Sequence, residues 1–176
     1  MQKADLIVLN GLWMESYEQK LWESVGSGKI ILVSELLSNL IHLNKTTETH
    51  KEETHNEKHD HGNIDPHTWL SPKSYLQMAE VLSQELEKKW FKPNTNFLEN
   101  LKTLDTNYKT ALKNCTQKEI VTSHDAFRYL ARDYGFNEHP IFGISPEEEP
   151  SAKDIADTIE LIKKQKLTAI FSEEFV

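Results

Sequence analysis

The sequence predicts an α/β fold built on parallel sheets. Short apolar runs alternate with stretches whose apolar residues recur at helical spacing, and short connections join them, a pattern typical of parallel strands with crossover helices. We expect strands at residues 5–10, 30–33, 120–122, 141–144 and 167–171. We expect helices at residues 13–22, 34–42, 72–90, 95–113 and 126–134, and one that begins after Ser151.

Local signals mark the ends of three of these helices. Ser71-Pro72 places an N-cap serine before a proline at the first helical position. Ser151 is followed three residues later by Asp154, which predicts a capping box that uses aspartate. Gly135 suits the left-handed position that commonly ends a helix.

Two apolar stripes predict buried helix faces. In the first stripe, successive apolar residues lie four, three, four and four positions apart within residues 95–113. A helix of that length is roughly 28 Å long, enough to cross a small domain or tie two together. A polar break at residues 113–117 follows and marks a candidate domain boundary. The stripes consist of Phe97, Leu101, Leu104, Tyr108 and Leu112, and of Ile155, Ile159 and Ile162.

The composition argues against several classes of function. The formal net charge of −8 disfavours nucleic acid or an anionic membrane as the main partner, because both attract a basic face. No apolar run approaches the ~18–20 residues of a membrane span. The lone Cys115 leaves no internal disulfide. The chain has no zinc-protease helix, nucleophile elbow or glycine-rich phosphate loop, so we expect no enzyme and no catalytic residue.

A histidine-rich acidic segment occupies residues 44–63, which hold no aliphatic side chain and no Phe, Tyr or Trp. This composition predicts a surface loop. Its mixed nitrogen and oxygen donors would attract a borderline metal weakly, since they lack a fixed geometry. A merely solvated acidic tract is the alternative. The histidines of this loop are His50, His55, His59 and His61.

Two other histidines are candidates for fixed metal ligands. His67 stands where apolar residues return after the loop, and His124 follows the strand expected at residues 120–122. Ligands of open α/β sheets collect beyond the carboxyl ends of strands, and neutral imidazole is a common zinc ligand. Spacing alone leaves a structural hydrogen-bonding role open for both. Asp125 is a candidate either to orient the His124 ring or to cap the next helix.

These segments together resemble the metal-binding substrate-binding proteins of ABC uptake transporters, and within them the zinc-uptake branch. The matching segments occur in family order and cover nearly the whole chain outside the loop. They are ADLIVLNGLWMES at 4–16, the acidic histidine loop, DPHTWLSP at 65–72, VTSHDAFRYLARDYG at 121–135, GISPEEEPSA at 143–152 and AIFSEE at 169–174.

The resemblance implies two parallel-sheet lobes joined by a long rigid helix, with both lobes incomplete in this chain. Residues 1–93 would form the N-terminal lobe without its first strands, carrying the loop at about 44–63. Residues 94–116 would form the linking helix, and residues 117–176 would begin the C-terminal lobe. A signal sequence and the family's first histidine ligand are expected upstream of Met1, and its carboxylate ligand beyond Val176.

The resemblance also implies a function, which is high-affinity binding of Zn²⁺ and its delivery to an ABC-type permease. His67 and His124 would be the metal ligands, and His50, His55, His59 and His61 an auxiliary low-affinity loop. A histidine at the second ligand position favours zinc over manganese. The partners would be the permease and its ATPase, and the protein a periplasmic or extracytoplasmic monomer. The alternatives are a manganese- or iron-type member, a zinc-dependent hydrolase, and a metal-storage or adhesive surface protein.

Overall fold

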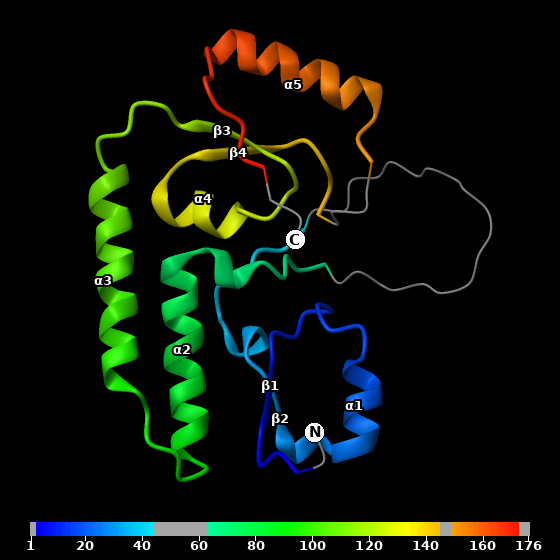
Figure 1. The fold of residues 1–176 in the computed structure, drawn as a ribbon, viewed down its shortest axis with the longest axis vertical. Coiled ribbons are helices and arrows are strands. Elements are labelled where there is room, and N and C mark those ends of the chain that lie inside the picture. Colours follow the sequence, from blue (N-terminus) through cyan, green and yellow to red (C-terminus); the bar gives the residue numbers. More distant parts are fainter. Residues whose placement is uncertain (1–2, 44–62, 145–148, 173–176) are drawn as a thin grey trace, which may run out of the picture. The chain divides into compact units, whose positions relative to one another are not determined.

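A computed structural model describes residues 3–43, 63–144 and 149–172 (Figure 1). Contacts within the chain define two compact units, residues 1–66 and residues 67–176. The elements in chain order are β1 (Ile7–Leu9), α1 (Glu18–Val25), η1 (Ser27–Lys29), β2 (Ile30–Leu32), η2 (Ser34–Leu36), η3 (Thr68–Leu70), α2 (Pro72–Glu87), α3 (Thr95–Leu112), β3 (Glu119–Thr122), α4 (Arg128–Tyr134), β4 (Asn137–Pro140) and α5 (Ala152–Gln165). The division into lobes at residues 93 and 116 stays a prediction.

The first unit contains a two-stranded parallel sheet. Strands β1 and β2 pair with Val8 opposite Ile31, and α1 lies in the connection between them, as the strand–helix–strand pattern predicted. The helix begins at Glu18 and not at residue 13, because Leu12 and Trp13 have φ values of 54° and 63°, which an α-helix does not accommodate. The 34–42 helix is likewise reduced to the single 3₁₀ turn η2.

The second unit contains another parallel pair, β3 and β4, with Val121 opposite His139. Helix α4 joins the two strands and ends at Gly135, whose φ of 75° is left-handed as predicted. The strand expected at 141–144 is wrong, since β4 spans Asn137–Pro140. The strand expected at 167–171 is reduced to one bridge, between Phe171 and Thr122.

Helices α2 and α3 pack against each other in the second unit (Figure 1). Both begin where the sequence predicted. The Ser71 side chain accepts a hydrogen bond from the Ser74 amide at the start of α2, and Asn94 caps α3 through the Phe97 amide. Helix α4 contacts α2, α3 and η3, so it lies at the centre of this unit's packing.

The two apolar stripes are less buried than expected. Leu101 is the stripe residue of α3 that is buried, while Phe97, Leu104 and Tyr108 stay exposed. In α5 the Ser151–Asp154 capping box is confirmed. The predicted buried face of α5 is wrong, since Ile155 and Ile159 are 45% and 46% exposed.

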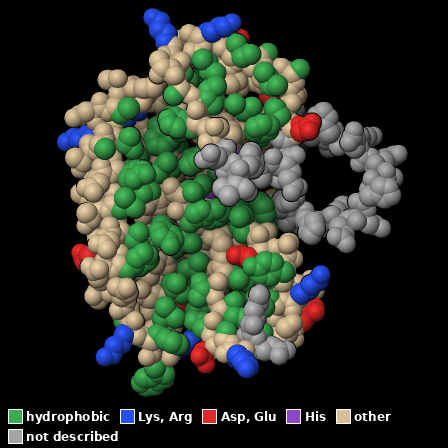
Figure 2. Space-filling model, viewed as in Figure 1, with side chains coloured by type: hydrophobic (Ala, Val, Ile, Leu, Met, Phe, Trp, Pro, Cys, Tyr) green, Lys and Arg blue, Asp and Glu red, His purple; other side chains and the backbone are tan. Residues whose placement is uncertain are grey.

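Figure 2 shows many apolar side chains at the visible surface of the described residues. No helix among these residues combines the length and the apolar character needed to span a bilayer.

Candidate metal centre

His67 lies at the N-terminal end of η3, the 3₁₀ turn that leads into α2. Its carbonyl accepts a hydrogen bond from the Leu70 amide at 3.3 Å, and its side chain lies among packed atoms, with the residue only 6% exposed. The ring of Trp69 lies 5.4 Å from the His67 ring, tilted by 49°. Fully buried Thr68 donates to Met78 Sδ at 3.3 Å and so fixes η3 to α2.

His124 occupies the turn between β3 and α4, beyond the carboxyl end of its strand as predicted. Backbone hydrogen bonds hold this turn from two other segments. The Ser123 amide donates to the Phe171 carbonyl at 2.9 Å, and the Asp125 amide donates to the Gly143 carbonyl at 3.1 Å. His124 is 7% exposed, so both candidate ligands are buried histidines of the same unit.

The rings of His67 and His124 meet edge to face, with centroids 5.4 Å apart and planes at 67°. In a tetrahedral zinc site each bound nitrogen is about 2.0–2.1 Å from the metal, which puts each ring centre about 3.2 Å from it. Two such rings at the tetrahedral angle would have centres about 5.2 Å apart. The observed separation therefore suits two imidazoles that share one metal ion.

The described residues hold no cluster of three or more His, Cys, Asp and Glu side chains arranged for a metal. The two candidate imidazoles are a pair, as their ring contact shows. The auxiliary histidines His50, His55, His59 and His61 lie outside the described residues. His139 forms a structural pair with Glu119, with Nε2 and Oε2 2.5 Å apart.

Glu138, on β4, supports the turn that carries His124. Its carboxylate accepts hydrogen bonds from Thr122 Oγ1 at 2.9 Å and from the amides of Phe127 at 3.0 Å and Ala126 at 3.3 Å. Burial raises the pKa of Glu138, and the Phe127 amide opposes that rise only in part. The residue was missed at the sequence level, because nothing near position 138 indicates a partner at position 122.

Asp133, near the end of α4, supports the segment that follows His67. Its side chain is 1% exposed, and its Oδ2 accepts hydrogen bonds from Ser71 Oγ at 2.6 Å and Ser74 Oγ at 3.2 Å. Arg132 Nε donates to Oδ1 at 2.9 Å. Burial alone would raise the pKa of Asp133, but the hydrogen bonds from Arg132 and Ser71 outweigh it, so the pKa is lowered. Sequence reasoning missed this residue too.

Asp125 forms an ion pair with Arg128, through Oδ1 and Nε at 2.6 Å and a second contact between Oδ2 and Nη2. The cap position of α4 is Phe127, so the helix-cap alternative for Asp125 is wrong. Its role in orienting the His124 ring stays a prediction.

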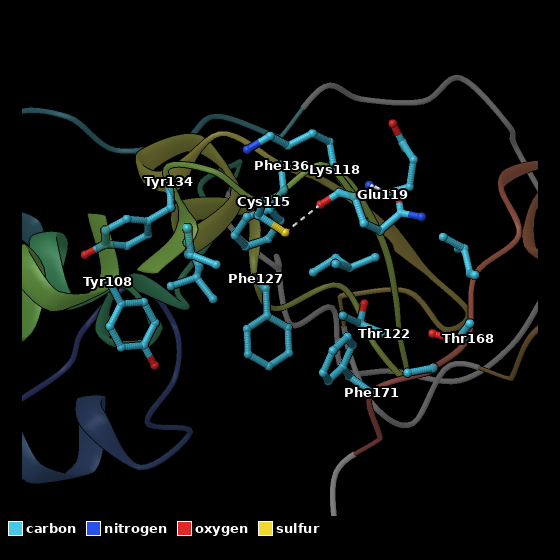
Figure 3. A pocket seen from close by; sticks show the side chains of 16 residues that line it. Tyr108, Cys115, Lys118, Glu119, Thr122, Phe127, Tyr134, Phe136, Thr168 and Phe171 are labelled. Carbon is cyan, nitrogen blue, oxygen red and sulfur yellow. Dashed lines mark hydrogen bonds between the residues drawn. The ribbon is translucent and has the colours of Figure 1, made fainter. Parts of the chain in front are cut away.

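An apolar cavity of about 500 Å³ lies beside β3 in the same unit (Figure 3). Neither candidate ligand lines it, although Thr122, two residues before His124, does. Cys115 lies at its edge, with Sγ 3.2 Å from the Gln117 carbonyl oxygen (Figure 3). The apolar residues that line the cavity include Tyr108, Leu112, Phe127, Leu130, Phe136 and Phe171.

The fold is that of an α/β protein with parallel strand pairs, and it places two buried imidazoles together, one after a parallel strand and one at the start of η3. The chain belongs to the ZnuA family, the periplasmic component A of the zinc-uptake complex, whose sequence model matches residues 1–176. The family resemblance read from the sequence is therefore confirmed.

Individual relatives agree with this assignment. The zinc-binding lipoprotein AdcA of Streptococcus pneumoniae strain R6 is 34% identical over 181 residues, covering 99% of this chain and 36% of that protein. The high-affinity zinc uptake system protein ZnuA of Bacillus subtilis is 35% identical over 181 residues, covering 99% and 56%. The chain thus spans about a third to just over half of the length of these curated relatives.

A solved structure shows the same fold. The Zn(II)-bound form of an AdcAII variant from Streptococcus pneumoniae aligns with a TM-score of 0.75 at 28% identity, over 97% of this chain and 63% of that one. Together with the parallel pairing of β1 with β2 and of β3 with β4, this likeness confirms the predicted α/β fold class.

Proposed function

We propose that the protein binds Zn²⁺ as cargo, with His67 and His124 as fixed ligands, and delivers it to an ABC-type permease. The observation that carries this proposal is the pair of buried rings 5.4 Å apart, a separation that suits tetrahedral coordination. Membership of the ZnuA family and the zinc-binding names of AdcA and ZnuA support zinc as the ion.

The donor chemistry also favours zinc over the manganese or iron alternative. Imidazole nitrogen suits zinc, whereas carboxylate, carbonyl and water oxygens suit manganese. In this centre the two side chains brought together are both histidines, and the adjacent Asp125 carboxylate is paired with Arg128.

Binding without catalysis is the second part of the proposal. A zinc hydrolase needs a general base beside the metal-bound water. Three carboxylates that support this centre are already engaged: Asp125 with Arg128, Asp133 with Ser71, and Glu138 with the Phe127 amide. The relatives are likewise named for zinc binding and uptake.

The remaining parts of the proposal follow from the family. The protein would act as a monomer in the periplasm or an equivalent extracytoplasmic space, with the permease and its ATPase as partners. The lobes would be residues 1–93 and 117–176, joined by residues 94–116. The histidines at positions 50, 55, 59 and 61 would collect zinc at low affinity without setting the affinity of the fixed site.

Calorimetric titration of Zn²⁺ into His67→Ala and His124→Ala tests this function. Each change is expected to weaken zinc binding by about 100-fold or more, since loss of an outer-shell partner alone typically costs 10–100-fold. His139→Ala is the matched control, because His139 belongs to the same unit but pairs with Glu119. Wild-type affinity in both ligand variants would overturn the proposal.

A further inference from the structure

The Asp133 carboxylate contacts several side chains at the start of α2. Within the second unit its carboxylate accepts hydrogen bonds from Ser71 and Ser74, which lie 62 and 59 residues away in sequence. Lys73 Nζ lies 3.5 Å from Oδ1, and Arg132 donates from the adjacent position. Two cations and two hydroxyl groups from two helices thus converge on one buried carboxylate.

The contacts of Asp133 link the segments that follow the two candidate ligands. His67 is followed by the single turn η3 and then by Ser71, the cap of α2. His124 is followed by a short turn and then by α4, the helix that contains Asp133. The Ser71–Asp133 hydrogen bond of 2.6 Å therefore joins the segment behind one imidazole to the helix behind the other.

We propose that Asp133 is a positioning residue for zinc, which sets the location of the His67 ring relative to His124 by holding Ser71. This inference rests on the proposed zinc function and extends it to a residue that does not touch the metal. Ligand side chains must be held within about 0.5 Å of the productive geometry. A shift of η3 by that amount would move the His67 nitrogen out of coordination range.

The substitution Asp133→Asn would break this arrangement for a chemical reason. The amide keeps one acceptor oxygen and replaces the other with an NH₂ donor, so it can accept from Ser71 and Ser74 or face Arg132 and Lys73 with an oxygen, but it cannot do both. It also removes the negative charge that balances Arg132 and Lys73. The start of α2 would therefore lose its fixed position relative to α4.

The experiment compares four changes in the full chain. Asp133→Asn tests the carboxylate. Ser71→Ala removes the 2.6 Å hydrogen bond to Asp133 together with the cap contact from the Ser74 amide, and Ser71→Thr keeps a hydroxyl for both. Asp154→Asn is the matched control, because Asp154 belongs to the same unit and its carboxylate likewise accepts from a helix-capping serine, Ser151, at 2.6 Å, but on α5.

Two measurements separate positioning from general stability. Zinc affinity is measured by competition with a chelating dye, and the visible absorption of bound Co²⁺ reports the coordination geometry. We expect Asp133→Asn and Ser71→Ala to lower zinc affinity by about tenfold and to change the Co²⁺ spectrum. Ser71→Thr should restore both properties, and Asp154→Asn should leave both unchanged even where it lowers the melting temperature.

The outcomes distinguish this inference from the function on which it rests. If His67→Ala and His124→Ala bind zinc normally, the proposed function fails. If those two variants lose zinc while Asp133→Asn and Ser71→Ala keep wild-type affinity and spectrum, only the inference is overturned. Equal losses in Asp154→Asn would overturn it as well. Should Asp133→Asn not fold, the Ser71→Ala and Ser71→Thr pair decides the question.

Discussion

The two candidate ligands are held in different ways. The turn of His124 is held largely through backbone groups, with amides of Ser123 and Asp125 donating to carbonyls of two other segments. The segment after His67 depends on side chains, above all on the hydrogen bonds of Ser71 and Ser74 to Asp133. Both arrangements lie within the unit of residues 67–176.

This contrast shows where the centre is sensitive to substitution. Backbone hydrogen bonds survive most side-chain changes, and more than one of them holds the turn that carries His124. On the His67 side, one carboxylate, Asp133, accepts the hydrogen bonds of both Ser71 and Ser74. We therefore expect the His67 side to respond more strongly than the His124 side to loss of its supporting carboxylate.

Loss of the Asp133 charge should have the largest effect on folding stability. Asp133→Asn is expected to lower the free energy of unfolding by about 2 kcal/mol, within the range for losing hydrogen bonds to a charged group, since the side chains of Lys73 and Arg132 remain 42% and 33% exposed to water. Urea denaturation of the metal-free protein measures this change. A loss as small as that of an exposed ion pair, below about 1 kcal/mol, would break the contrast between the two sides.

Glu138→Gln should lower the free energy of unfolding less than Asp133→Asn does. The glutamine carbonyl oxygen can still accept from the Phe127 amide and from Thr122 Oγ1, so we expect a loss of about 1 kcal/mol and nearly unchanged zinc affinity. The same urea denaturation and dye competition provide the comparison. If Glu138→Gln weakened zinc binding as much as Asp133→Asn, the two supports would be equivalent and the contrast would be lost.

The pH dependence of stability should have opposite signs on the two sides. The pKa of Asp133 is lowered in the folded protein, so its contribution is full above about pH 4, the unfolded value. That contribution is lost as the pH falls through the folded pKa. Unfolding free energies of wild type and Asp133→Asn, measured from pH 7 downward, should therefore converge in acid.

For Glu138 the pKa is raised in the folded protein, so protonation favours folding. Wild type should gain stability relative to Glu138→Gln as the pH falls from neutral through the folded pKa, and the gain should level off below about pH 4.3, the unfolded value. A stability difference that is independent of pH would contradict the burial of this carboxylate.

Deletion of residues 46–62 should have the smallest effect on the fixed site. The deletion removes His50, His55, His59 and His61 but neither His67 nor His124. We expect the tight zinc-binding step to persist in calorimetry, while additional weak binding disappears. A larger loss of affinity from this deletion than from His67→Ala would reverse the assignment of the fixed ligands.

Local signals explain which parts of the fold were predictable. The starts of α2 and α5 follow from the Ser71-Pro72 and Ser151–Asp154 pairs, whose capping contacts lie within three residues. Strand β4 was missed because it is polar in sequence. The side chains of Glu138 and His139 pair with Thr122 and Glu119, the two end residues of β3, and such long-range pairing leaves no local pattern.

The same difference between local signals and long-range contacts applies to the candidate site. His67 and His124 could be named from residue type, position and family resemblance. Asp133 could not, because its hydrogen bond to Ser71 spans 62 residues and exists only once α4 packs beside the start of α2. Likewise, α1 begins late because tertiary contacts, such as the Trp13 indole N–H on the Ile64 carbonyl, act on the residues that precede it.

The central claim is that His67 and His124 bind one zinc ion together. Anomalous diffraction at the zinc edge, from crystals of the zinc-loaded protein, tests it most directly. We expect one strong peak about 2.0–2.1 Å from a ring nitrogen of each histidine. A peak that touches only one of the two rings, or that lies away from both, would contradict the claim.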